Sequence, residues 1–130
     1  DQLEVLQWMR AQNPPCPWDE NACASAAMLG HLATLQWLRA QTPPCPWDAD
    51  ACACAAAGGG QLATLQWIRM HSSRVNWIVV CAAAAAGGHL DTLRWAVTQA
   101  PHSWITKSLC IDQAFKYDRP AVLQWLRDHL

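Results

Sequence analysis

The stretch that decides the fold runs from Cys45 to Arg69 and reads CPWDADACACAAAGGGQLATLQWIR. A closely similar stretch, CPWDENACASAAMLGHLATLQWLR, runs from Cys16 to Arg39. Two copies of one pattern within a chain of 130 residues indicate an internal repeat. Periods of this size are typical of arrays in which each unit stabilises its neighbours.

A tryptophan anchors each copy of the repeat, in the phrases LEVLQWM, LATLQWL, LATLQWI, LDTLRWA and PAVLQWL. These anchors are 29, 30, 28 and 30 residues apart, at Trp8, Trp37, Trp67, Trp95 and Trp125. A second series has intervals of 29, 30 and 27 residues, at Trp18, Trp47, Trp77 and Trp104. So many tryptophans in register exclude chance similarity.

Each unit reads as two helices. Segment 32–41 carries leucines and a tryptophan on a broad apolar arc, the pattern of a helix with neighbours on both sides as well as beneath. Two prolines then end the helix, because proline cannot donate a backbone hydrogen bond. Asp48 is the expected N-cap of the next helix, a thin Ala/Cys run that stops at the glycines 58–60.

The alternation predicts an all-α fold with no strand. Thick Leu/Trp-rich helices are expected near 2–12, 32–41, 62–71, 90–99 and 120–129, and thin helices near 19–28, 48–57, 77–86 and 104–116. We expect a helical-repeat solenoid of stacked antiparallel helix pairs. Residues 1–130 would form one array of about four helix pairs plus a leading outer helix, as part of a longer chain.

The segment AAMLGHLATL, residues 26–35, resembles the centre of an ankyrin repeat, and residues 85–93 are similar to it. The Trp-containing second helix and the CPWD connector look like the divergent ankyrin-like repeats of algal, oomycete and giant-virus proteins. The period of 27 to 30 residues is shorter than the usual value of about 33, so the projecting fingers should be short or absent. The resemblance implies that a partner protein binds on the concave face lined by the thin helices and connectors.

The composition excludes some classes of function. Charged residues make up 15% of the chain, against about 25% in a typical domain, and the net charge is −1. Without a basic stripe, we expect no nucleic-acid binding. The apolar run 75–90 is shorter than the roughly 20 residues of a spanning helix, so we expect no membrane span. Seven cysteines, an odd number, favour reduced thiols in an intracellular reducing compartment, cytoplasmic or organellar.

The cysteines and glycines favour a structural interpretation over a chemical one. Cys52 and Cys54 would point about 200° apart on a helix, so they cannot share a metal. We expect the cysteines to be small buried hydrophobes. No nucleophile stands near a base at a recognisable spacing, and the glycines do not form a phosphate-binding loop. We therefore expect no enzyme activity, no metal and no cofactor.

The histidines also favour a structural interpretation. His31 and His89 occupy one repeat position, and Gln61 occupies it in the unit between them, which argues against a general base. By resemblance to ankyrin repeats, such a histidine would hydrogen-bond to the backbone of the neighbouring turn. His71 and the equally isolated His102 and His129 receive no role.

The two tryptophan series are interpreted differently. The first series is expected in the core. The second series has two interpretations: its rings either cover the ends of adjacent helix pairs or form a row of amphipathic anchors for a partner, since tryptophan is enriched at interface hot spots.

These patterns predict a non-catalytic scaffold that binds a partner protein through the thin helices and connectors. The scarcity of charge predicts an apolar interface and a hetero-complex rather than a homo-oligomer. The candidate contacts are Trp18, Glu20, Ser25, Trp47, Asp50, Ala53, Trp77 and Trp104. Polar selectivity is expected from Thr106, Lys107 and Asp112. The alternative is a structural subunit permanently embedded in a large multiprotein assembly, for example an organellar one.

Overall fold

The computed structural model describes residues 2–11, 20–41, 44–100 and 104–129, and every regular element in these ranges is an α-helix. The thick helices are α1 (Gln2–Arg10), α3 (Leu32–Ala40), α5 (Leu62–His71), α7 (Leu90–Gln99) and α9 (Pro120–His129). The thin helices are α2 (Glu20–Leu29), α4 (Ala49–Gly58), α6 (Trp77–Gly87) and α8 (Trp104–Lys116). The all-α prediction is confirmed, and the helix boundaries lie within about two residues of the predicted ones.

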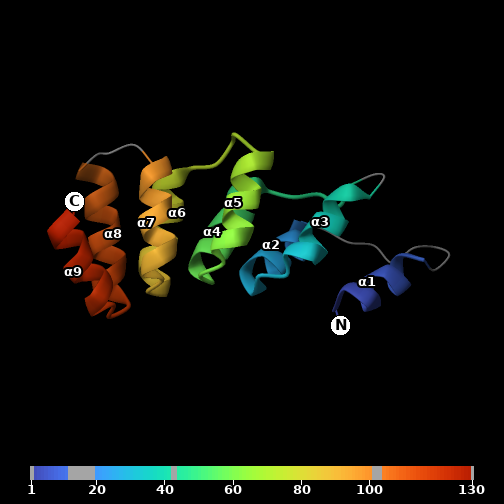
Figure 1. The fold of residues 1–130 in the computed structure, drawn as a ribbon, viewed down its shortest axis with the longest axis horizontal. Coiled ribbons are helices and arrows are strands. Elements are labelled where there is room, and N and C mark those ends of the chain that lie inside the picture. The colour runs from blue at the N-terminus through green and yellow to red at the C-terminus, as the bar shows by residue number, and fades with distance from the viewer. Residues whose placement is uncertain (1, 12–19, 42–43, 101–103, 130) are drawn as a thin grey trace.

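The helices follow one another in chain order, with the two termini at opposite ends of the molecule (Figure 1). Helix α2 packs against α4, α4 against α6, and α6 against α8. Each of these four helices also packs against the helix that follows it in the chain. We call α2, α4, α6 and α8 the even row, and the remaining five helices the odd row.

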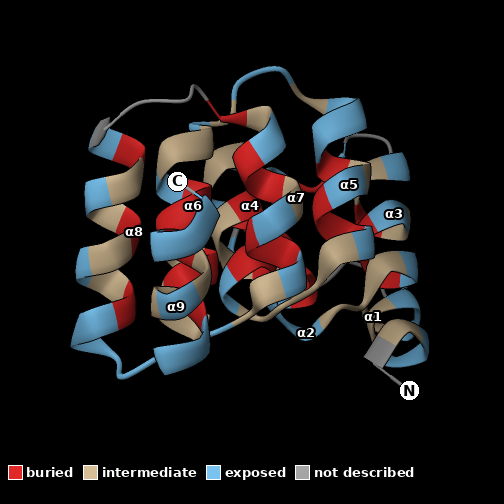
Figure 2. Cartoon of the chain, turned by 60° about the vertical axis from the view of Figure 1, so that its left-hand side comes forward, coloured by how far each residue is buried: buried red, intermediate tan, exposed pale blue. Residues whose placement is uncertain are grey.

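The core lies where the two rows meet. The even row contributes small side chains, and the interior of α4 alone buries Cys52, Ala53 and Ala56 completely. The odd row contributes the large side chains, led by Leu35, Leu38, Leu65, Ile68, Leu93 and Leu126. Full burial of one such side chain stabilises the fold by roughly 1.5–3 kcal/mol. Figure 2 shows the buried residues on the facing sides of the helices and the exposed ones on the outside.

Side-chain caps begin two of the thin helices. The Asp48 carboxylate accepts hydrogen bonds from the backbone N–H groups of Asp50 (3.0 Å) and Ala51 (3.2 Å), which confirms the predicted N-cap of α4. Asn76 caps α6 in the same way, because its Oδ1 accepts from the backbone N–H of Ile78 at 3.2 Å. Such a cap stabilises a helix by about 1 kcal/mol.

A left-handed residue ends each thin helix. Three are glycines, Gly30, Gly60 and Gly88, with φ of 74°, 72° and 74°. In the fourth unit Asp118 takes the left-handed conformation, with φ of 54°. The residue that follows donates its N–H to a carbonyl five residues earlier, as from His89 to Ala84 at 3.1 Å. This closure is typical of a helix that ends and reverses the chain sharply.

Short connectors follow the thick helices wherever the structure describes them in full. Helix α5 ends at His71 and α6 begins at Trp77, so residues 72–76 make the whole connection. Within the four described ranges, no helix combines the length and the apolar composition that crossing a membrane requires.

Candidate functional site

Two residues predicted to contact a partner are buried instead. Ala53 of α4 is 0% exposed and belongs to the core, so its side chain cannot reach a partner of the folded chain. Thr106 of α8, predicted to add polar selectivity, is 3% exposed. Ser25 of α2 and Asp112 of α8 are exposed, and Lys107 is half-buried. The even row therefore presents only part of the surface that the sequence suggested.

Asp50 joins two neighbouring units. Its carboxylate accepts a hydrogen bond from the backbone N–H of Asn76 at 3.0 Å, and its side chain is half-buried. Asn76 is itself the cap of α6, so this bond ties the first turn of α4 to the start of α6. This geometry gives Asp50 a structural role, whatever part it has in binding a partner.

The second tryptophan series packs against the first. The rings of Trp47 and Trp67 meet edge to face, with centroids 5.9 Å apart and planes at 65°. Trp77 and Trp95 repeat the arrangement at 5.6 Å and 78°. Both Trp47 and Trp77 are half-buried against the core, as expected of rings that cover the ends of helix pairs.

The core prediction for the first tryptophan series is wrong at one end of the array. Trp37, Trp67, Trp95 and Trp125 are half-buried and pack against the core. Trp8 is 66% exposed. Among the described helices α1 packs mainly against α3, so the ring of Trp8 has little protein to cover it.

Several predicted residues lie outside what the structure describes. Trp18, Cys16 and His102 fall in the ranges between the described segments. Glu20 opens α2 and Trp104 opens α8, but their side chains are not among those described.

Side chains link each turn to the one before it. His89 Nε2 lies 3.0 Å from the carbonyl oxygen of Gly58, which confirms the role predicted for this histidine. One unit later, Arg119 Nε donates to the carbonyl oxygen of Ala86 at 2.9 Å. The Gln61 side chain packs against Gly30, in the space that a side chain at residue 30 would need. The turn position is therefore a structural link between units, filled by whichever side chain reaches back.

Four cysteines form a regular series that the sequence analysis missed. Cys23, Cys52, Cys81 and Cys110 are each 29 residues apart and fully buried, one in each helix of the even row. Cys81 and Cys110 hydrogen-bond to each other across the contact of α6 and α8. The signal was available, since an interval of 29 lies within the range of the tryptophan spacings.

Burial raises the pKa of most of the buried thiols, whereas the hydrogen bond with Cys81 lowers the pKa of Cys110. Burial raises the pKa of Cys52 from 9.0 to about 11, with Asp48 adding to the shift. It does the same for half-buried Cys54, to about 11, with Asp50 and Asp48 adding to it. Burial also raises the pKa of Cys23. A thiol held protonated is a poor nucleophile and a poor metal ligand. Among the residues that the structure describes, no three His, Cys, Asp or Glu side chains come together to hold a metal.

Two histidines to which the sequence analysis gave no role have one. His71 stacks on Trp67 with ring centroids 4.1 Å apart, and its Nδ1 lies 2.9 Å from the Trp67 carbonyl oxygen. His129 stacks on Trp125 in the same way, with ring centroids 5.0 Å apart, and its Nδ1 lies 3.0 Å from the Trp125 carbonyl oxygen. Both stand four residues after a tryptophan of the first series, and that spacing was the available signal.

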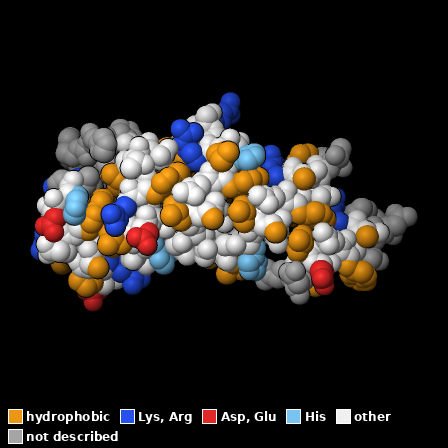
Figure 3. All heavy atoms as spheres, viewed as in Figure 1, with side chains coloured by type: hydrophobic (Ala, Val, Ile, Leu, Met, Phe, Trp, Pro, Cys, Tyr) orange, Lys and Arg blue, Asp and Glu red, His pale blue; other side chains and the backbone are white. Residues whose placement is uncertain are grey.

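Each helix of the even row exposes at least one uncharged residue. We define the even-row face by one such residue from each helix: Ser25, Ala51, Val79 and Ser108. Val79 is 42% exposed although it is apolar. On the opposite side, where the odd row lies in front, Figure 3 shows hydrophobic side chains spread along the length of the molecule.

Comparison of this chain with protein-family models, with curated proteins and with solved structures finds no match.

Proposed function

We propose that the chain is an ankyrin-like repeat array, a solenoid of helix pairs with short connectors, and that it acts as a non-catalytic scaffold for a partner protein. The repeat of the sequence, the successive packing along the even row and the links between turns support the solenoid. The single observation that carries the binding function is the even-row face, which exposes an uncharged residue on each of its four helices.

Such a face fits a partner that approaches closely. Small side chains such as Ser25 and Ala51 let a helix or a flat apolar surface pack near the backbone. Val79 adds apolar area at its centre. Because its four defining residues are uncharged, binding would depend on burial of apolar surface more than on ion pairs. The half-buried Trp47 and Trp77 would contribute their exposed edges at the rim.

The test combines partner capture with matched charge substitutions. The double variant A51E/V79E places two carboxylates on the face, and the control Q66E places one on the exposed side of α5. Residues 51 and 79 lie in the first turns of α4 and α6, where an acid suits the helix dipole, so folding should be kept. We expect Q66E and the native chain to retain one set of partners that A51E/V79E loses. If all three chains capture the same partners, the even-row face is not the binding surface.

A second candidate is a subunit permanently embedded in a larger assembly. Large apolar side chains that are exposed elsewhere in the array favour it, with Trp8 at 66%, Met70 at 81% and Phe115 at 77%. Exchange separates the two functions. Partners that stay bound in a fixed ratio when excess free chain is added would support the embedded subunit, and partners that transfer to the added chain would exclude it.

A further inference from the structure

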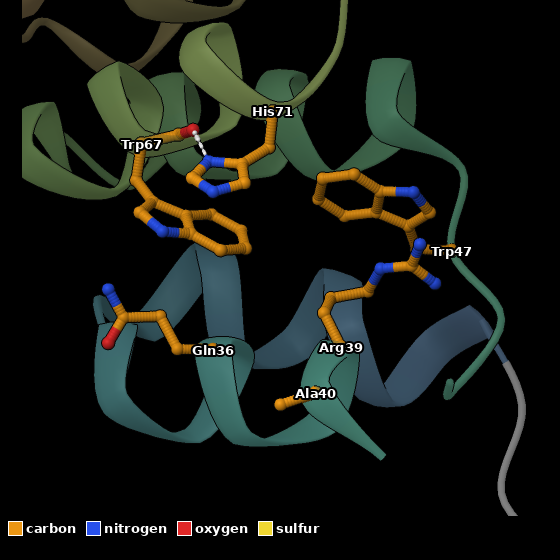
Figure 4. A pocket seen from close by; sticks show the side chains of 6 residues that line it. All are labelled: Gln36, Arg39, Ala40, Trp47, Trp67 and His71. Atoms are coloured by element: carbon orange, nitrogen blue, oxygen red, sulfur yellow. Dashed lines mark hydrogen bonds between the residues drawn. The ribbon is translucent and has the colours of Figure 1, made fainter. Parts of the chain in front are cut away.

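A pocket opens between α3 and α5, next to the connector that carries Trp47. Its volume is about 290 Å³, and it is lined by Gln36, Arg39, Ala40, Trp47, Trp67 and His71. Figure 4 shows the indoles of Trp47 and Trp67 together on one side of the hollow, with Arg39 reaching toward them from α3 on the other. This volume lies at the lower end of the range for ligand pockets, so a single small group would fit.

The next pair of thick helices shows why this pocket exists. Between α5 and α7, Arg69 Nε donates to Gln99 Oε1 at 3.0 Å, which closes the gap. Arg39 and Arg69 each stand two residues after a repeat tryptophan, and His71 and Gln99 each stand four residues after the next one. The α3–α5 gap therefore has a histidine in place of the glutamine that accepts the arginine.

His71 does not serve as the hydrogen-bond acceptor for Arg39. Its Nδ1 must carry the proton that is shared with the Trp67 carbonyl oxygen at 2.9 Å, because a carbonyl oxygen can only accept. The ring is also stacked on Trp67, with planes at 25°. The imidazole thus forms part of the pocket wall, and Arg39 donates to the Cys45 carbonyl oxygen instead.

Arg39 is fixed at the mouth of the pocket. Its Nη1 donates to the Cys45 carbonyl oxygen at 2.7 Å, and its guanidinium lies 4.6 Å from the centre of the Trp47 ring. A guanidinium has five N–H donors, and the bond to Cys45 uses one of them. A charged group held in this way binds a planar anion with little loss of side-chain freedom.

We propose that this pocket binds a carboxylate group, with Arg39 as the charged donor and the indoles of Trp47 and Trp67 as walls for the carbon skeleton that bears it. None of the six lining residues is acidic. The nearby Asp48 uses its carboxylate to cap α4. A paired guanidinium and carboxylate are matched in charge and in planar geometry. The proposal does not depend on the scaffold function.

The first experiment titrates the 130-residue chain with sodium benzoate and, separately, with uncharged benzamide. Binding is followed by NMR at the side-chain Nε–H of Arg39 and at the His71 ring. We expect benzoate to shift both signals to saturation and benzamide to leave them unchanged. Equal shifts from both ligands, or none from benzoate, would overturn the proposal.

Three variants test the geometry. R39Q should weaken benzoate binding at least tenfold, whereas R69Q should leave it within twofold of the native value. H71Q offers Arg39 the acceptor that Gln99 offers Arg69, so it should close the pocket and abolish binding without lowering the melting temperature. If folded R39Q and folded H71Q both bind as the native chain does, the pocket is not a carboxylate site.

The source of the carboxylate is decided by a second pair of probes, N-acetyl-glutamate-N-methylamide and its glutamine counterpart. Tighter binding of the glutamate compound than of benzoate supports an acidic side chain of a protein partner. Tighter binding of benzoate supports a free aromatic acid. Equal binding of the glutamate and glutamine compounds would count against a carboxylate site.

Discussion

The Nε2 atom of His89, just before α7, lies 3.0 Å from the carbonyl oxygen of Gly58, at the end of α4. Because a carbonyl oxygen only accepts, the Nε2 atom must carry a proton and donate it. Arg119 Nε makes the equivalent bond to Ala86 one unit further along. The bond is therefore a property of the repeat position, and different donors satisfy it.

Removing this donor should loosen the contact between the second and third units. We expect H89A to lower the free energy of unfolding by about 1 kcal/mol, the usual net value of one hydrogen bond. H89R should recover part of the loss, since Arg119 makes the equivalent bond one unit further along. Urea unfolding followed by circular dichroism measures both. An H89A variant as stable as the native chain would show that the bond contributes nothing.

Gly58 and Gly60, at the turn that follows α4, should change the stability in opposite directions when each is replaced by alanine. Gly60 has φ of 72°, and a methyl group there would meet His89 Nδ1 at 2.6 Å. The left-handed backbone alone costs a residue with a side chain about 1–2 kcal/mol, so we expect G60A to destabilise by at least that amount. Gly58 ends α4 in open space, and G58A should stabilise by about 0.4–1 kcal/mol.

Thermal unfolding of G60A, G58A and the native chain checks both signs in one experiment. Equal melting temperatures for the two variants would mean that the backbone angle at Gly60 is not needed for the turn.

The helices were predictable because local chemistry marks both of their ends. Asp48 caps the start of α4 and the left-handed Gly60 follows its end, so the sequence carried a signal for both ends of the helix. The orientation of a thin helix was not predictable. Since α4 is composed mainly of alanine, it has no apolar stripe to show which side faces its neighbours. Ala53 was therefore placed on a surface when it is fully buried.

The candidate site was harder to predict than the fold, because its residues act in pairs across units. The sequence showed both tryptophan series but not the edge contact of Trp47 with Trp67. It also did not show that His71, four residues after Trp67, leaves Arg39 without the acceptor that Arg69 finds in Gln99. Such pairings depend on how far neighbouring helices are offset, and that offset is a property of packing.

The edge-to-face pairs should be energetically coupled. Aromatic pairs of this kind contribute about 0.5–1.5 kcal/mol beyond the area they bury. A double-mutant cycle with W47L, W67L and W47L/W67L should therefore give a coupling of that size. The cycle W77L with W67L is the control, since no ring contact joins that pair among the aromatic contacts of the described residues. Equal coupling in both cycles would attribute the effect to general packing.

Alkaline pH should destabilise the fold through its buried thiols. Cys54 ionises near its ordinary pKa of 9.0 when exposed by unfolding, but at about 11 in the folded chain. Between these values the folded state holds more protons than the unfolded state, so stability is constant below pH 9 and falls as the pH rises toward 11. One such thiol contributes a slope of up to about 1.4 kcal/mol per pH unit. Because Cys54 is only half-buried, C54A should remove its part of the slope at a small cost in packing. Urea unfolding of C54A and the native chain at pH 8 and pH 10 measures the difference, and parallel losses in both chains would mean that Cys54 keeps its ordinary pKa in the folded state.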